Sequence, residues 1–147
     1  MKYILIFLLC LTVLLLPQVL YTNIEIFKTP FFMLSINNYK YINIFIIIIL
    51  SILFSISLKE NYFNNNRKLL FITILNYIFY LLYVLFSFII ISPFLSFTFK
   101  FSSFIAALYL NEELNNIDNK RVKLLIPYII WNFYLTLVTL STFIINQ

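Results

Sequence analysis

The side chains of this sequence that could do chemistry are aromatic rings, hydroxyls and amides set within apolar stretches. The 147 residues include no histidine and one cysteine, Cys10, which excludes an intrachain disulfide and the usual metal sites. No pair of acids lies within an apolar stretch, and no serine has a base beside it. We therefore predict that the protein is not an enzyme and has no obligatory cofactor.

The most informative pattern lies in the last stretch, residues 120–147. It opens with three cations and then runs without a charge to the C-terminus. Tyr128, Trp131, the single tryptophan, and Asn132 recur at helical spacing and share one face. The same face carries Leu135, Thr139, Thr142 and Asn146. A helix surrounded by lipid would not carry amides and hydroxyls along one face. We therefore expect this helix to pack against, or enclose, something polar.

Composition excludes a water-soluble domain, because 63% of the residues are hydrophobic and only 10% are charged. A net charge of +5 on so apolar a chain indicates cations that flank a membrane, and not a nucleic-acid-binding surface. The apolar stretches predict an all-α membrane protein, a five-transmembrane-helix bundle in one domain, residues 1–147. The predicted helices are about 3–20, 41–58, 69–91, 94–110 and 122–145.

Two boundaries and the orientation follow from local signals. The stretch 3–20 lacks a small-residue cleavage pattern, so we interpret it as an uncleaved helix and not as a signal peptide. Pro93 divides the long apolar run 69–110 into a hairpin, and residues 111–121 are expected to form a loop. Lysines and arginines gather beside the N-terminus and two loops on the same side, which predicts a cytoplasmic N-terminus and an outside C-terminus.

Further polar side chains lie within or beside the predicted helices. Asn76, Tyr77 and Tyr80 share a face of helix 69–91 with Thr73 and Ser87. Thr136 and Thr139 are expected to form hydrogen bonds between helices. The aromatic residues after Pro30 suit either a belt at the membrane interface or a lid over a binding site.

Lys100 is a cation within the predicted helix 94–110. It shares a helix face with Ser96, Ser103 and Ala107, so it should point toward the bundle. None of the five acids is expected within a span, so no internal counter-charge is predicted. Two alternatives stay open: Lys100 meets a carboxylate of a ligand, or it extends to the outer interface.

Three short motifs, in order along the chain, resemble a known family. They are Leu-Leu-Ile-Pro-Tyr-Ile-Ile-Trp at 124–131, Leu-Asn at 75–76, and Lys-Thr-Pro-Phe-Phe at 28–32. With five predicted helices, the whole chain is similar to the TspO/MBR family. That family comprises the tryptophan-rich sensory proteins and the translocator protein, or peripheral-type benzodiazepine receptor.

The resemblance implies an integral protein of a bacterial cell membrane that binds a tetrapyrrole, such as protoporphyrin IX or haem, as a receptor, sensor or transporter. It also implies that a homodimer is one expected form. The implied ligand-binding residues are Trp131, Tyr128, Asn132, Asn76, Tyr77, Phe79, Tyr80, Pro30 and Phe31, and to these we add Lys100. Light-dependent porphyrin breakdown, proposed for the family, is not expected, because it would need two tryptophans in the pocket and one is present. No cation follows Lys123, so the sterol-recognition motif of animal members is not implied.

Two alternatives come from other classes of protein. One is a small structural or assembly subunit of a membrane complex, whose interior is simply packed. The other is a transport protomer for a different hydrophobic ligand. Quenching of the single tryptophan by an added porphyrin would separate binding from packing.

Overall fold

A computed structural model describes residues 30, 33, 38, 41–49, 66–117 and 122–147 of the chain. These residues form α4 (Arg67–Phe88), α5 (Pro93–Asn115), the short 3-10 helix η2 (Lys123–Leu125) and α7 (Ile126–Ile145). Residues 41–49 are also helical, and no strand occurs in the described ranges. The helical fold class is therefore confirmed. The count of five helices stays a prediction, because residues 3–20 and 50–58 lie outside the described part.

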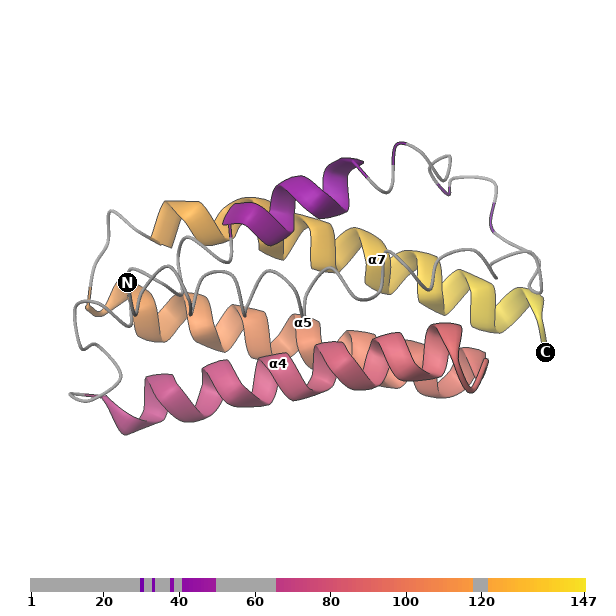
Figure 1. Cartoon of the computed structure of the whole chain (residues 1–147), viewed down its shortest axis with the longest axis horizontal. Helices are drawn as coiled ribbons and strands as arrows, with labels where there is room; N and C mark the ends of the chain where they lie inside the picture. The colour runs from indigo at the N-terminus through magenta and orange to yellow at the C-terminus, as the bar shows by residue number, and fades with distance from the viewer. Residues whose placement is uncertain (1–29, 31–32, 34–37, 39–40, 50–65, 118–121) are drawn as a thin grey trace, which may run out of the picture.

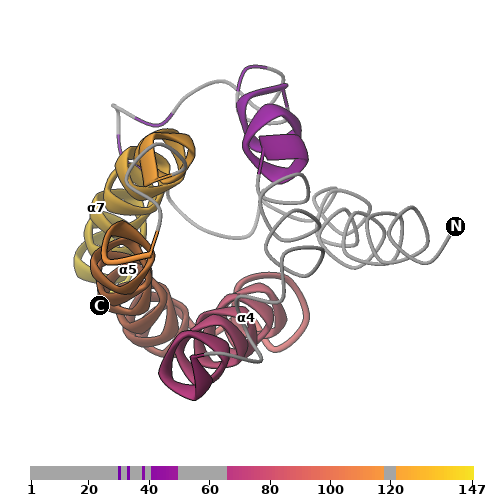
Figure 2. The ribbon, with the colours of Figure 1, turned by 90° about the vertical axis from the view of Figure 1, so that its left-hand side faces the viewer.

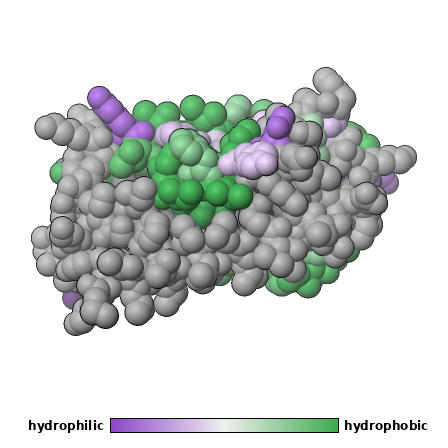
Figure 3. All heavy atoms as spheres, turned by 45° about the horizontal axis from the view of Figure 1, so that its top comes forward, coloured by the Kyte–Doolittle hydropathy of each residue, from purple (hydrophilic) through white to green (hydrophobic). Residues whose placement is uncertain are grey.

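The helices α4, α5 and α7 lie lengthwise beside one another, with α5 antiparallel to the other two (Figure 1). Viewed from the end, α5 stands between α4 and α7, and helix 41–49 lies across from α5 (Figure 2). Three stretches, Arg67–Phe88, Pro93–Asn115 and Lys123–Ile145, are long and apolar enough to cross a membrane. On the face in Figure 3, hydrophobic side chains dominate the described surface, as lipid contact requires.

Helix α4 begins two residues before the predicted start and ends three residues before the predicted end. Its first residue is Arg67, because the side chain of Asn66 accepts a hydrogen bond from the backbone N–H of Leu69 at 3.1 Å. After Phe88 the chain reverses through Ile91, which has a φ of 57°. The sequence contains no glycine, so a β-branched residue takes this left-handed position, at a cost of roughly 1–2 kcal/mol.

Helix α5 corrects the predicted loop at 111–121. It starts at Pro93, which needs no N–H in a first turn, and continues to Asn115. Leu110, Glu113 and Leu114 are buried, so the inward face of the helix extends beyond the predicted end at residue 110. Glu112 and Glu113 consequently lie within a helix, contrary to the expectation that no acid does.

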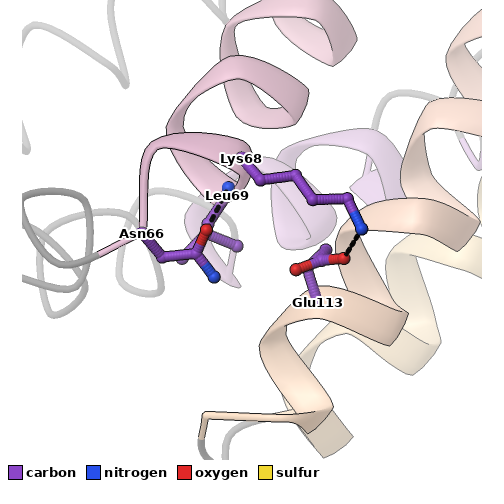
Figure 4. Close-up of polar contacts among 4 residues, drawn as sticks. All are labelled: Asn66, Lys68, Leu69 and Glu113. Atoms are coloured by element: carbon purple, nitrogen blue, oxygen red, sulfur yellow. Dashed lines mark hydrogen bonds and ion pairs between the residues drawn. The ribbon is translucent and has the colours of Figure 1, made fainter.

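The end of α5 is joined to the start of α4 by an ion pair. Lys68 contacts the carboxylate of Glu113, directly beside the Asn66 cap (Figure 4). Glu113 is buried, whereas the side chain of Lys68 is largely exposed. The pair links the C-terminal end of α5 to the N-terminal end of α4.

The last predicted span, 122–145, is divided into two parts. Residues 123–125 form the 3-10 turn η2, and the α-helix α7 begins at Ile126, with Pro127 in its first turn. Proline lacks an N–H, which suits the start of an α-helix and not its interior. The rings of Phe94 and Phe143 lie 5.5 Å apart, and those of Phe104 and Phe133 5.7 Å apart, which sets the register of α5 against α7.

Candidate functional site

A hydrogen-bonded node joins the three long helices in the interior. The side-chain oxygen Oδ1 of Asn76 on α4 accepts hydrogen bonds from Ser103 Oγ on α5, at 3.0 Å, and from Tyr128 OH on α7, at 2.9 Å. All three residues are buried. The polar faces predicted on helices 69–91 and 122–145 therefore contact each other in the interior of the bundle. They do so because the periodicity of 3.6 residues turns both polar faces inward.

The indole of Trp131 lies one turn further along α7. Its Nε1 donates a hydrogen bond to Oδ1 of Asn43, at 3.1 Å, and its ring stacks on Tyr134 with centroids 5.2 Å apart. Trp131 and Asn43 are both buried. The indole thus ties helix 41–49 to α7, and the ring contributes to an apolar cluster with Ile46 and Leu135.

Asn132 presents a buried acceptor beside this cluster. Its Nδ2 donates to the backbone carbonyl of Tyr128 at 3.0 Å, whereas its Oδ1 has no hydrogen-bond partner among the described residues. Because the residue is fully buried, an unpaired acceptor here costs about 1–3 kcal/mol. A donor on a bound molecule, or a water, would remove that cost.

The two threonines of α7 do not behave as predicted. Thr136 donates to the carbonyl of Asn132, and Thr139 donates to those of Leu135 and Thr136, all within α7. The expected hydrogen bonds between helices are therefore wrong for both residues. A threonine hydroxyl in a helix readily reaches the carbonyl four residues earlier, which satisfies it without a partner helix.

Lys100 lies in the interior and not at the outer surface of the bundle. Its side chain is only 1% exposed. The ammonium Nζ stands 4.6 Å from the ring centroid of Tyr83 and 5.4 Å from that of Tyr80, both on α4. Ser96 and Ser103, on the same face of α5, are buried as predicted. The two rings stabilise the cation through their π-faces.

The remaining predicted residues take varied positions. Tyr80 is buried, and Tyr77 is half-buried against the cluster of Ile47, Tyr80, Tyr83 and Val84. Phe79 is partly exposed on α4. Pro30 is buried, and its carbonyl accepts a hydrogen bond from the N–H of Met33 at 3.0 Å. Phe31 lies outside the described residues, so the choice between belt and lid stays open.

Two residues of this interior were missed from sequence. Asn43 follows the start of an apolar run, and its spacing to Ile46 and Ile47, which are also buried, could have identified it as inward-facing. Tyr83 lies three residues after Tyr80 and could have been placed on the same face by the same rule.

The arrangement offers three kinds of interaction to a molecule in the interior. Ring faces of tyrosine and tryptophan suit an aromatic plane, Oδ1 of Asn132 suits a donor, and the Lys100 ammonium suits an anion. Among the residues described, no three of the types His, Cys, Asp and Glu lie close enough to hold a metal ion. Comparison of the sequence with protein-family models and with curated proteins finds no match.

Proposed function

We propose that the protein is a membrane receptor for a tetrapyrrole such as protoporphyrin IX or haem, as its resemblance to the TspO/MBR family implies. The observation that supports this most is the convergence of aromatic and amide side chains from three helices, α4, α7 and helix 41–49. Trp131 and Tyr128 of α7 are linked to Asn43 and to Asn76, and each of these residues is buried.

The chemistry of a tetrapyrrole matches that of the interior. A flat, apolar macrocycle gains from stacking on aromatic faces and from exclusion of water. Tyr80, Tyr128 and Trp131 supply buried rings, and Asn132 supplies an acceptor that receives no hydrogen bond from the part of the chain that the structure describes. A small number of polar groups in an apolar surround is the usual composition of such a site.

The membrane orientation belongs to the same proposal. We place the protein in a bacterial cell membrane with the N-terminus in the cytoplasm and the C-terminus outside. In this orientation the turn between α4 and α5 faces outward, and the Lys68–Glu113 pair lies near the cytoplasmic side.

A second candidate function is a structural subunit with a packed interior. The node at Asn76 favours it, because the hydroxyls of Ser103 and Tyr128 both donate to the same oxygen and need no ligand. Satisfied polar contacts between membrane helices stabilise packing in the same way. Ligand binding is what separates the two functions.

The test is quenching of the single tryptophan by protoporphyrin IX in lipid nanodiscs. Porphyrins also partition into lipid, so the titration is repeated at two ratios of lipid to protein. A binding site gives quenching that saturates at a fixed number of porphyrins per protein at both ratios. Quenching that follows only the amount of porphyrin per lipid would contradict the proposal.

Two variants on the same turn of α7 locate the site. Asn132→Leu fills the inward position, whereas Ile130→Leu alters the outer face, where Ile130 is exposed. We expect the first to weaken binding and the second to leave it unchanged. Equal effects would contradict an interior site, and flux of porphyrin across proteoliposomes would distinguish a carrier from a receptor.

A further inference from the structure

Lys100 is a cation held deep in a helix bundle. It follows the start of α5 by two turns, or about 10 Å along the axis, and its side chain is 1% exposed. The ammonium contacts the ring faces of Tyr80 and Tyr83. A cation in this position costs free energy unless an opposite charge compensates it, and ring faces compensate only part of that cost.

The described residues supply no carboxylate to Lys100. The two acids among them, Glu112 and Glu113, lie at the opposite end of α5, about 18 Å further along the axis. Glu113 is already paired with Lys68. A negative charge brought by a bound molecule would complete the charge balance at Lys100.

Lys100 also stands next to the groups that would hold an aromatic plane. Ser103 follows it by one turn and is hydrogen-bonded to Asn76, which also accepts from Tyr128. On the other side, Ser96 precedes Lys100 by one turn and shares a hydrogen bond of 2.6 Å with Ser87 of α4. Hydroxyl groups therefore flank the ammonium along the α4–α5 contact. A molecule stacked near Tyr128 would have its acidic substituents within reach of this contact.

We propose that Lys100 binds a carboxylate of the ligand and so makes the protein selective for anionic tetrapyrroles. This rests on the proposed function and adds the class of substituent that is recognised. The propionates of a porphyrin are oriented toward the α4–α5 contact, and the macrocycle lies toward α7. Esterification of the propionates removes the charge that Lys100 recognises.

The experiment compares protoporphyrin IX with its dimethyl ester, by tryptophan quenching in nanodiscs, for the wild type and Lys100→Met. Methionine keeps the length and apolar volume of the lysine stem and removes the charge. Lys123→Met is the control, because Lys123 is exposed at the start of the last span. The emission spectrum without ligand, compared with that of the wild type, checks that each variant is folded.

We expect Lys100→Met to bind the dicarboxylate about 10- to 100-fold more weakly, as loss of a charged hydrogen bond predicts, and to bind the ester as the wild type does. Lys123→Met should bind both as the wild type does. Unchanged affinity of Lys100→Met for the dicarboxylate overturns this proposal and leaves the proposed function standing. Absence of saturable binding of both compounds to the wild type overturns the two together.

Discussion

The node at Asn76 predicts a non-additive loss of stability. Tyr128→Phe removes one of the two donors to Oδ1, and Ser103→Ala removes the other. Each single change leaves the buried oxygen with one partner, so each should lower the free energy of unfolding by about 0.6–2 kcal/mol. The double variant leaves that oxygen with no donor, and an unpaired buried acceptor costs about 1–3 kcal/mol. The double variant should therefore lose about 1 kcal/mol more than the sum of the singles.

Reversible unfolding in mixed micelles, followed by far-UV circular dichroism, measures these free energies. Two control variants make the same chemical changes away from the node. Tyr109→Phe alters an exposed tyrosine of α5, and Ser102→Ala removes a hydroxyl that donates to the carbonyl of Thr98 in its own helix. We expect both controls to stay within about 0.5 kcal/mol of the wild type, because neither change removes a hydrogen bond between helices that the structure describes.

The outcome that refutes this reasoning is additivity. If the losses of Tyr128→Phe and Ser103→Ala simply add, then the two hydroxyls do not share the oxygen of Asn76. The three helices would then be held without this node. A Tyr128→Phe variant as stable as the Tyr109→Phe control would also contradict the hydrogen bond from Tyr128 to Asn76.

Three further predictions test the positions of other groups. Asn43→Leu removes the Asn43 acceptor of the Trp131 indole N–H, so tryptophan emission should move to shorter wavelength and stability should fall by about 1–3 kcal/mol. An unchanged spectrum would contradict this contact. Glu113→Gln should lower the melting temperature and reduce its dependence on salt, because Lys68 loses its counter-charge. A melting temperature that depends on salt as in the wild type would show that the pair is absent in solution. The hydroxyl oxygens of Ser87 and Ser96 lie 2.6 Å apart, so cysteines at both positions, in a Cys10→Ser background, should oxidise to a disulfide within one chain. If mass spectrometry finds no cross-link, the register of α4 and α5 is contradicted.

Periodicity predicts the inward faces of α4 and α7, although some residues of the predicted polar faces, such as Tyr77, Thr142 and Asn146, are only half-buried. Asn76, Tyr80, Tyr128, Trp131 and Asn132 were all placed on inward faces from their spacing, and all are buried. The all-helical class followed from the apolar length of each stretch. Both signals are local, so they can be recognised without knowledge of the neighbouring helices.

What sequence could not provide depends on contacts between distant segments. The apolar run ends at Leu110 and predicts a loop over 111–121, yet Glu113 pairs with Lys68 across 45 positions and the helix continues to Asn115. The acceptor for Trp131, at Asn43, lies 88 positions away. The rings around Lys100 come from another helix, so the cation–π contacts required the packing of α4 on α5.

The threonines of α7 illustrate a choice that spacing leaves undecided. A hydroxyl on an inward face can bond to a neighbouring helix or to its own backbone, and both are compatible with burial. Thr136 and Thr139 both donate to backbone carbonyls of their own helix. The turn at Ile91 is a similar case, because its left-handed conformation is unusual for a β-branched residue and no local signal predicts it.

Isothermal titration of protoporphyrin IX into nanodiscs that contain the protein, with empty nanodiscs of the same lipid as reference, tests the function most directly. If the interior of this bundle binds a tetrapyrrole, the heat that exceeds the reference should saturate near one porphyrin per chain, and Asn132→Leu should bind more weakly. Heats indistinguishable from those of the empty nanodiscs would show that the side chains between the helices serve packing alone.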